Sequence, residues 1–222
     1  NYFPHLSPMK WPAEFLTRMQ SYFGNDYDTF LEGLSKPAPV SIRMNERKAI
    51  RQFENCKSIP WSRSGFYLEE RPSFTLDPLF HAGCYYVQEA GSQFLEQLFL
   101  HAIKEKEEPI VLDLCAAPGG KSTHLLSLMN GSGLLVSNEV ISSRNKVLQQ
   151  NIAKWGFANS IVTQNDSSDF SKAGELFDVI VVDAPCSGEG LFRRDPNAAN
   201  EWSETAVTAC SVRQHEILDN IH

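Results

Sequence analysis

The sequence predicts an α/β protein in which a small α+β domain precedes a doubly wound, Rossmann-like domain. Two short apolar segments, Ile110–Leu114 and Phe177–Val182, are typical of parallel strands that are buried on both faces. Between them, segments with apolar residues at helical spacing alternate with further short strands. This alternation favours a parallel sheet covered by helices from about Glu89 onward, with its ligand site at the carboxyl ends of the strands.

The N-terminal domain is predicted to cover residues 1–84, and the doubly wound domain residues 85–222. Apolar residues at helical spacing follow Pro12 and Asp26, which predicts two short helices near the start of the chain. The segment Val40–Asn45 then has the pattern of a strand, and scattered aromatic residues after it indicate a loop-rich β region.

In the second domain, helices and strands alternate in a regular order. After the first strand, the pattern predicts a helix at Lys121–Met129, a strand at Gly133–Val140, a helix marked by Leu148, Ile152 and Trp155, and a strand at Ser160–Gln164. The segment Phe177–Val182 is then the fourth strand of the parallel sheet.

Composition and charge exclude several classes of protein. The chain has 222 residues and a formal net charge of -7, so any nucleic-acid surface must be local. Its 5 cysteines form no C-x-x-C pair, which argues against structural zinc and against a secreted disulfide framework. No apolar run reaches the roughly 20 residues that span a bilayer. We expect a cytoplasmic monomer with no metal ion and no membrane attachment.

A turn of small residues follows the first strand of the second domain. It runs from Asp113 to Ser122 with the sequence DLCAAPGGKS, which lets a ligand approach the backbone where a helix begins. The pattern is neither the glycine fingerprint of dinucleotide-binding folds nor a P-loop. A nucleoside cofactor fits this position, and a tight turn without a ligand is the alternative.

Acidic residues follow the next two strands at the same predicted rim of the sheet. Glu139 stands about 20 residues after Gly119, the spacing at which an acid binds ribose hydroxyls in nucleotide-binding folds. Asp166 follows the third strand and suits an adenine amino group. Each acid alone could cap a helix or face solvent, but with the turn they predict a cofactor site.

The fourth strand is followed by Asp183, Ala184, Pro185 and Cys186. A carboxylate and a thiol at the rim predict covalent chemistry, because a thiolate is a strong nucleophile whose pKa falls near positive charge. The alternative for Cys186 is a small, buried residue that fills space at the end of a strand.

Two motifs at this rim carry a family resemblance: the turn Asp113–Ser122 and the run Asp183–Pro196, with the sequence DAPCSGEGLFRRDP. Together they resemble the RNA 5-methylcytosine methyltransferases of the NOL1/NOP2/Sun family, and the similarity covers most of the chain. The resemblance implies a class I S-adenosylmethionine-dependent methyltransferase that methylates carbon 5 of a cytosine in ribosomal or transfer RNA through a covalent cysteine adduct. It implies cofactor contacts by Cys115, Ala116, Ala117, Pro118, Gly119, Gly120, Lys121, Glu139, Asp166 and Asp183.

The resemblance also implies two catalytic residues. Asp183 is expected close to the methyl donor and the target base, and Cys186 is expected to assist release of the product. Carbon 5 of cytosine is a poor nucleophile, so a thiolate must first add at carbon 6. In this family that thiolate belongs to a Thr-Cys dipeptide on a later strand.

No Thr-Cys dipeptide occurs in this sequence, which is its main departure from the family. Cys210 follows Thr208 and Ala209, and we interpret it as structural. We expect the nucleophile beyond His222, so that the methyltransferase domain is truncated here before its final strands, and a C-terminal RNA-binding domain could follow.

Basic residues supply the predicted contacts with RNA, because phosphate binding needs local positive charge on an acidic chain. The predicted RNA-contact residues are Arg43, Arg47, Lys48, Arg51, Arg193 and Arg194. A solvated helix face beside the core is the alternative for the segment that begins at Glu46.

Two other functions stay open at this point. A cytosine-5 DNA methyltransferase would use Cys186 itself as the nucleophile, and a noncatalytic RNA-binding or ribosome-assembly protein could retain the cofactor fold. The turn at Cys115–Lys121 and the run Arg193–Pro196 resemble the RNA family rather than the DNA enzymes.

Overall fold

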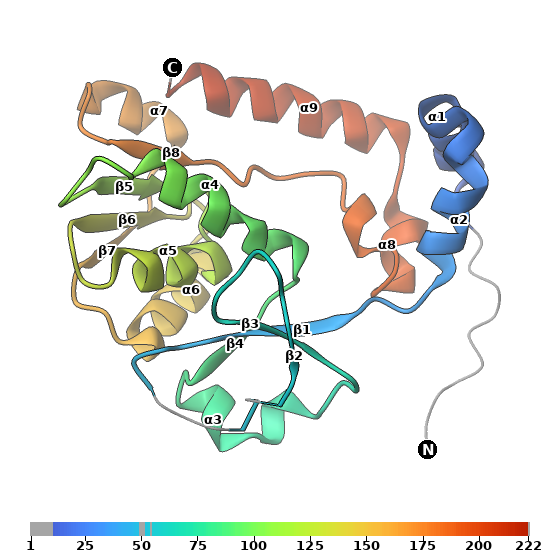
Figure 1. The fold of residues 1–222 in the computed structure, drawn as a ribbon. Helices are drawn as coiled ribbons and strands as arrows, with labels where there is room; N and C mark the ends of the chain where they lie inside the picture. The colour runs from blue at the N-terminus through green and yellow to red at the C-terminus, as the bar shows by residue number, and fades with distance from the viewer. Residues whose placement is uncertain (1–10, 49–51, 54, 222) are drawn as a thin grey trace. The chain divides into compact units, whose positions relative to one another are not determined.

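The computed structural model describes residues 11–48, 52–53 and 55–221 (Figure 1). These residues form two compact units. We call residues 11–38 with 185–219 the helical unit, and residues 39–184 with 220–221 the sheet unit. The sheet unit holds both sheets of the described chain.

A four-stranded parallel sheet forms one half of the sheet unit. Its strands are β5 (Ile110–Asp113), β6 (Leu134–Asn138), β7 (Ser160–Thr163) and β8 (Val179–Val181). They lie in the order β7-β6-β5-β8, and every pairing is parallel. The predicted doubly wound α/β fold is confirmed, although the predicted strands were one or two residues too long at several ends.

Helices precede the first of these parallel strands and connect each one to the next (Figure 1). They are α4 (Leu95–Ala102), α5 (Gly120–Met129), α6 (Ser142–Trp155) and the short α7 (Ser167–Phe170), with the single turns η3 (Gly91–Phe94) and η4 (Ser171–Ala173). Each helix that follows a strand starts near the carboxyl end of that strand, so α5, α6 and α7 all begin at one rim of the sheet.

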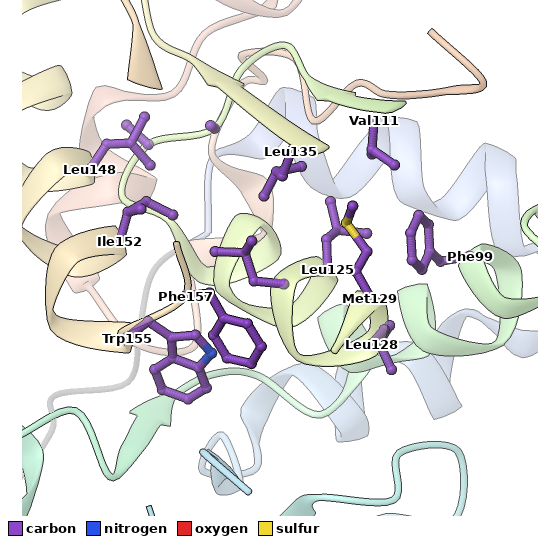
Figure 2. Packing of buried hydrophobic residues seen from close by; sticks show 13 residues of the cluster. Phe99, Val111, Leu125, Leu128, Met129, Leu135, Leu148, Ile152, Trp155 and Phe157 are labelled. Carbon is purple, nitrogen blue, oxygen red and sulfur yellow. The ribbon is translucent and has the colours of Figure 1, made fainter. Parts of the chain in front are cut away.

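The main core lies between the parallel sheet and helices α4, α5 and α6 (Figure 2). Helix α5 is buried on nearly all sides, with every residue from Ser122 to Met129 buried. Leu125 and Leu126 of this helix, Leu148 of α6 and Leu135 of β6 are fully enclosed. A helix this deeply buried holds the turn that precedes it against a rigid base.

A four-stranded antiparallel sheet forms the other half of the sheet unit. Its strands are β1 (Val40–Met44), β2 (Lys57–Ser58), β3 (Gly65–Leu68) and β4 (Tyr85–Val87), in the order β2-β3-β1-β4. The turn η2 (Phe74–Leu76) and the short helix α3 (Pro78–His81) precede β4. Because β4 pairs with β1, this sheet continues through Val87, past the boundary expected after residue 84.

The helical unit joins the start of the described chain to residues 185–219. Its elements are α1 (Ala13–Phe23), η1 (Gly24–Asp26), α2 (Tyr27–Ser35), η5 (Glu189–Leu191), α8 (Pro196–Glu201) and α9 (Glu204–Asp219). Phe15 of α1 packs against Phe192 and Trp202, with ring centroids 5.0 and 5.8 Å apart. The two predicted N-terminal helices are present, and their apolar faces meet the segment from Phe192 to Val207, far later in the chain. No helix among the described residues could cross a bilayer.

Candidate cofactor rim

The turn between β5 and α5 is held close to the sheet by backbone hydrogen bonds. Ala116 N donates to Asn138 O at 2.8 Å, and Gly119 N donates to Ala116 O at 2.7 Å. Gly119 has a φ of 107°, a conformation that residues with a side chain rarely adopt, and a Cβ there would lie 3.2 Å from Leu148. The glycine is therefore required by the shape of the turn, as the sequence indicated.

Glu139 follows β6 at the same rim and is held in a fixed orientation. Its side chain is 3% exposed, and Oε1 accepts a hydrogen bond from Ile141 N at 2.9 Å. Arg144 Nη2 lies 3.4 Å from Glu139 Oε2 and donates to Ala117 O at 3.0 Å. Arg144 thus links the acid to the turn, a role that the sequence reasoning missed.

Asp166 follows β7 and begins α7. Its Oδ1 accepts hydrogen bonds from Ser168 N at 3.0 Å and from Ser168 Oγ at 2.7 Å. These two bonds lower the pKa of Asp166, so the exposed carboxyl is ionised at neutral pH. The residue is a helix cap, which was the alternative for this acid, and it follows β7 at the same rim as the turn.

Asp183 follows β8 and is paired across the rim with Lys121, the second residue of α5. Lys121 Nζ donates a hydrogen bond to Asp183 Oδ2. The Asp183 side chain is 59% exposed and the Lys121 side chain 25% exposed. The pair therefore connects the first turn of α5 to the fourth strand while leaving the carboxylate open to solvent.

Asp113, the last residue of β5, lies beneath the turn and was given no role from the sequence. It is fully buried, and its Oδ2 accepts a hydrogen bond from Ser122 Oγ at 2.6 Å. Its Oδ1 is buried without a hydrogen-bond partner among the described residues. Burial raises the pKa of this carboxyl to about 6, despite the opposing effects of Ser122 and Lys121. The sequence pattern that could have identified Asp113 as a site residue is an acid at the end of an apolar strand, just before a turn of small residues.

Cys115 begins the turn, and its surroundings suppress thiolate formation. Burial raises its pKa to about 11, and the nearby carboxylates of Asp113, Glu139 and Asp183 act in the same direction. A thiol with this pKa is protonated at neutral pH, which disfavours Cys115 as a nucleophile.

Cys186 lies in the helical unit, three residues after Asp183 in the chain, and its side chain is exposed. The exposure rules out the alternative in which it fills a buried space. The preceding Pro185 carbonyl accepts a hydrogen bond from Gln214 Nε2 of α9 at 2.9 Å. Cys210, also on α9, is half-buried.

The predicted contact between Arg43 and RNA is wrong, because the arginine is buried. Its side chain is fully buried in the sheet unit and its guanidinium bonds to protein groups throughout. Strand β1 places Arg43 between the antiparallel sheet and α5, where it has no surface to offer a phosphate. Charge counting along the sequence does not distinguish such a residue from a solvated one.

Arg47 and Lys48 lie at the opposite end of α6 from the rim. Lys48 Nζ donates to Lys154 O and to Ala82 O, each at 2.6 Å. The Arg47 guanidinium stacks on the ring of Phe157, 4.1 Å from its centroid. The 14 residues of α6 separate these groups from the rim by about 20 Å.

Of the remaining predicted RNA contacts, Arg193 and Arg194 lie in the helical unit. Arg193 donates to Lys36 O at 3.1 Å and to Pro37 O at 2.9 Å, just past the end of α2. Arg194 is exposed. Arg51 lies outside the described residues.

Within the described part of the chain, no group of three or more His, Cys, Asp or Glu residues is arranged to hold a metal ion.

Comparison with known proteins places these features in a family. A family model described as 16S rRNA methyltransferase RsmB/F matches residues 100–222. A second one, described as the N-terminal domain of 16S rRNA methyltransferase RsmF, matches residues 11–90. The second match spans the antiparallel sheet and the first helices.

Curated relatives and a solved structure are similar over most of the chain. Ribosomal RNA small subunit methyltransferase F of Pectobacterium atrosepticum is 35% identical over 230 residues, covering 96% of this chain and 47% of the relative. The protein of that name from Shewanella loihica is 36% identical over 209 residues, covering 87% and 42%. The crystal structure of a methyltransferase homolog protein from Pyrococcus horikoshii superposes with a TM-score of 0.76 at 28% identity, covering 97% of this chain and 72% of that one. The chain spans about half the length of the curated relatives it matches.

Proposed function

We propose that this chain, which belongs to the RsmB/F family of 16S rRNA methyltransferases, binds S-adenosylmethionine at the rim of its parallel sheet and takes part in methylating carbon 5 of a cytosine in ribosomal RNA. S-adenosylmethionine, the cofactor predicted from the sequence, is the methyl donor of this family. The observation that carries the proposal is the convergence of the turn, Glu139, Asp166 and the Lys121–Asp183 pair at the carboxyl ends of four parallel strands.

The residues present at the rim fit this cofactor. S-adenosylmethionine carries a sulfonium and an ammonium group, and the rim is rich in carboxylates. Asp113 Oδ1 has no hydrogen-bond partner among the described residues, so its negative charge lacks a full set of protein donors. Glu139 Oε2 lies 3.4 Å from Arg144 and retains acceptor capacity for a ribose hydroxyl. A cationic nucleoside is therefore favoured over a phosphorylated one.

In this proposal each part of the rim has a distinct task. Glu139 binds the ribose, Asp166 binds the adenine amino group, and the backbone of Cys115–Lys121 surrounds the rest of the cofactor. The bound cofactor supplies a methyl group on a positively charged sulfur. Asp183, oriented by Lys121, would face the methyl group and the target cytosine, and its carboxyl group would supply a proton to ring nitrogen 3 as the thiolate adds at carbon 6.

The proposed reaction needs a cysteine at two stages, first to add to carbon 6 of the cytosine and later to help release the product. Adding a thiolate at carbon 6 makes carbon 5 nucleophilic enough to accept the methyl group. Loss of the carbon 5 proton and of the thiolate then restores the aromatic ring. Cys115 is unsuited to addition because its pKa is raised to about 11, and we assign Cys186 to the release step. RNA contact is proposed for the exposed Arg194, with Arg193 beside it in the chain.

Methyl transfer to ribosomal RNA by the full-length protein tests the proposal. We expect labelled methyl groups from S-adenosylmethionine to appear in 16S rRNA, at a position that bisulfite sequencing reads as 5-methylcytosine. Asp183→Asn should lower the rate by on the order of 100-fold or more, whereas Asp28→Asn, an exposed position on α2, should not. A wild-type protein that transfers no methyl group to this RNA contradicts the proposal.

The role of Cys186 separates the RNA-type mechanism from the DNA-type alternative. If Cys186 acts in release, the Cys186→Ala protein should still form the covalent adduct and should accumulate it as a slow-migrating band on a denaturing gel with labelled RNA. Cys210→Ala is the matched control and should leave no stable band. Loss of both adduct and methylation in Cys186→Ala would make Cys186 the nucleophile instead.

A further inference from the structure

The charged side chain of Arg43 is enclosed in the sheet unit, and its hydrogen-bond partners in the described part of the chain include no carboxylate. Its Nε donates to Gln88 Oε1 at 2.8 Å, and its Nη2 donates to Thr123 Oγ1 at 2.7 Å. The guanidinium also lies over the ring of Trp155, 4.6 Å from the centroid. Burial lowers its pKa to about 9, so the group remains charged at neutral pH. Burying a cation in this way is costly, and an apolar residue could fill the same space.

The partners of Arg43 lead directly to the cofactor turn. Thr123 Oγ1 donates to Gly119 O at 2.8 Å, with Gly120 O at 3.1 Å. Arg43 Nη2 is itself 3.3 Å from Gly120 O. The guanidinium therefore fixes the hydroxyl of Thr123, and that hydroxyl binds the carbonyl of the glycine that ends the turn.

A second contact from the antiparallel sheet reaches the same place. Tyr86 of β4 packs against Gly120, where a Cβ would lie 3.3 Å from its ring. Arg43 of β1 and Tyr86 of β4 are paired across the two strands, so two neighbouring side chains of this sheet contact the start of α5. Gln88, the partner of Arg43 Nε, is held in turn because its backbone oxygen accepts hydrogen bonds from Ser41 Oγ and Gln93 Nε2.

We propose that Arg43 is a positioning residue for the cofactor turn, acting through Thr123 on the backbone of Gly119 and Gly120. The antiparallel sheet thereby contributes to cofactor binding although its strands supply no residue of the predicted cofactor site. The proposal rests on the proposed binding of S-adenosylmethionine at the turn. It differs from a merely stabilising role, in which loss of the bonds would weaken the fold and leave the affinity of the turn unchanged.

The decisive variants change the Thr123 hydroxyl, which connects Arg43 to the turn, and leave the buried cation in place. Thr123→Val deletes the hydroxyl at nearly constant volume, and Thr123→Ser restores it. In calorimetric titrations of the full-length protein with S-adenosylmethionine, Thr123→Val should raise Kd about tenfold, as expected for loss of a bond to a charged group, and Thr123→Ser should stay within about twofold of wild type. Arg43→Met should raise Kd at least as much, if it folds.

Arg47→Met is the matched control, because Arg47 also stacks on an aromatic ring but lies at the far end of α6. It should leave Kd unchanged. Hydrogen exchange supplies a readout independent of ligand: in Thr123→Val the amides of Gly119 and Thr123, which donate to Ala116 O and Gly119 O, should exchange about tenfold faster while those of β6 are unaffected.

The outcomes separate this inference from the proposed function. Wild-type protein that does not bind S-adenosylmethionine overturns both. Wild-type protein that binds it, together with a Thr123→Val protein of lower melting temperature but equal Kd, overturns the positioning role alone. Weaker binding by Thr123→Val with rescue by Thr123→Ser supports it.

Discussion

The two ends of the parallel sheet use charged side chains in opposite ways. At the rim, where the strands end, Asp183 is largely exposed and Asp113 Oδ1 has no partner among the described residues. At the other end, Lys48 and Asn45 bond to the carbonyl oxygens of Lys154 and Trp155, in the last turn of α6. At the first end the Asp183 carboxylate stays open to solvent and so to a ligand, whereas at the second end the polar side chains bond to the last turn of a helix.

Helix polarity explains this difference. Helices α5 and α6 begin at the rim and end at the opposite side, so the far end presents carbonyl groups that lack partners within the helix. Positive and amide side chains are attracted to such carbonyls. A basic segment next to the end of a helix is thus expected to stabilise it, and positive charge alone is weak support for an RNA site.

Removing an acid from each end tests the comparison most strongly. Glu139→Ala should weaken binding of S-adenosylmethionine by about 1.5–3 kcal/mol, because hydrogen bonds between the ribose and this carboxylate are lost. Glu108→Ala, an exposed acid just before β5 at the opposite end, should change the affinity by less than about twofold. Isothermal calorimetry measures both, and equal affinities for Glu139→Ala and wild type would remove Glu139 from the site.

Lowering the pH provides a second test, because it favours protonation of a histidine that is buried in α5. His124 is fully buried and 3.2 Å from Glu96, and burial, reinforced by Arg43, lowers its pKa from 6.5 to about 4. Between these two values the unfolded chain binds a proton that the folded chain excludes, so His124 reduces stability as the pH falls from 6.5 towards 4. His124→Gln should therefore gain stability relative to wild type on acidification.

The expected relative gain is on the order of 1–3 kcal/mol between pH 7 and pH 4.5, measured by urea unfolding. Asp113, whose raised pKa of about 6 favours the folded state as the pH falls, titrates in both proteins and cancels in the difference. His101→Gln, at an exposed position on α4, is the control. Parallel pH profiles for His124→Gln and wild type would show that His124 does not titrate in this range.

The smallest effect is expected at the far end. Lys48→Met removes two hydrogen bonds to backbone carbonyls, which should lower the free energy of unfolding by about 1–2 kcal/mol and leave cofactor affinity unchanged. Lys146→Met, an exposed lysine of α6, should have little effect on either quantity. If Lys48→Met instead flattened the salt dependence of RNA binding with no loss of stability, the far end would be an RNA surface and the comparison would fail.

Local sequence was sufficient to identify the parallel half of the fold and its rim. Apolar strands such as Ile110–Asp113 are short and continuous, and the small residues after them leave few alternatives to a tight turn. Because parallel strands all end at one edge, the acids at 139, 166 and 183 could be assigned to one place from their positions along the chain. The role of Gly119 also follows locally, since its backbone conformation is one that glycine alone adopts readily.

The environments of individual charges depended on contacts between distant segments. Arg43 and Arg47 are four positions apart, yet one is enclosed against Thr123 and Trp155 while the other stacks on Phe157 at the surface. Likewise, Phe15 meets Phe192 and Trp202 only through packing across most of the chain. Burial, hydrogen-bond partners and pKa are properties of the assembled neighbourhood, because desolvation and pairing arise from residues remote in sequence, and no local pattern specifies them.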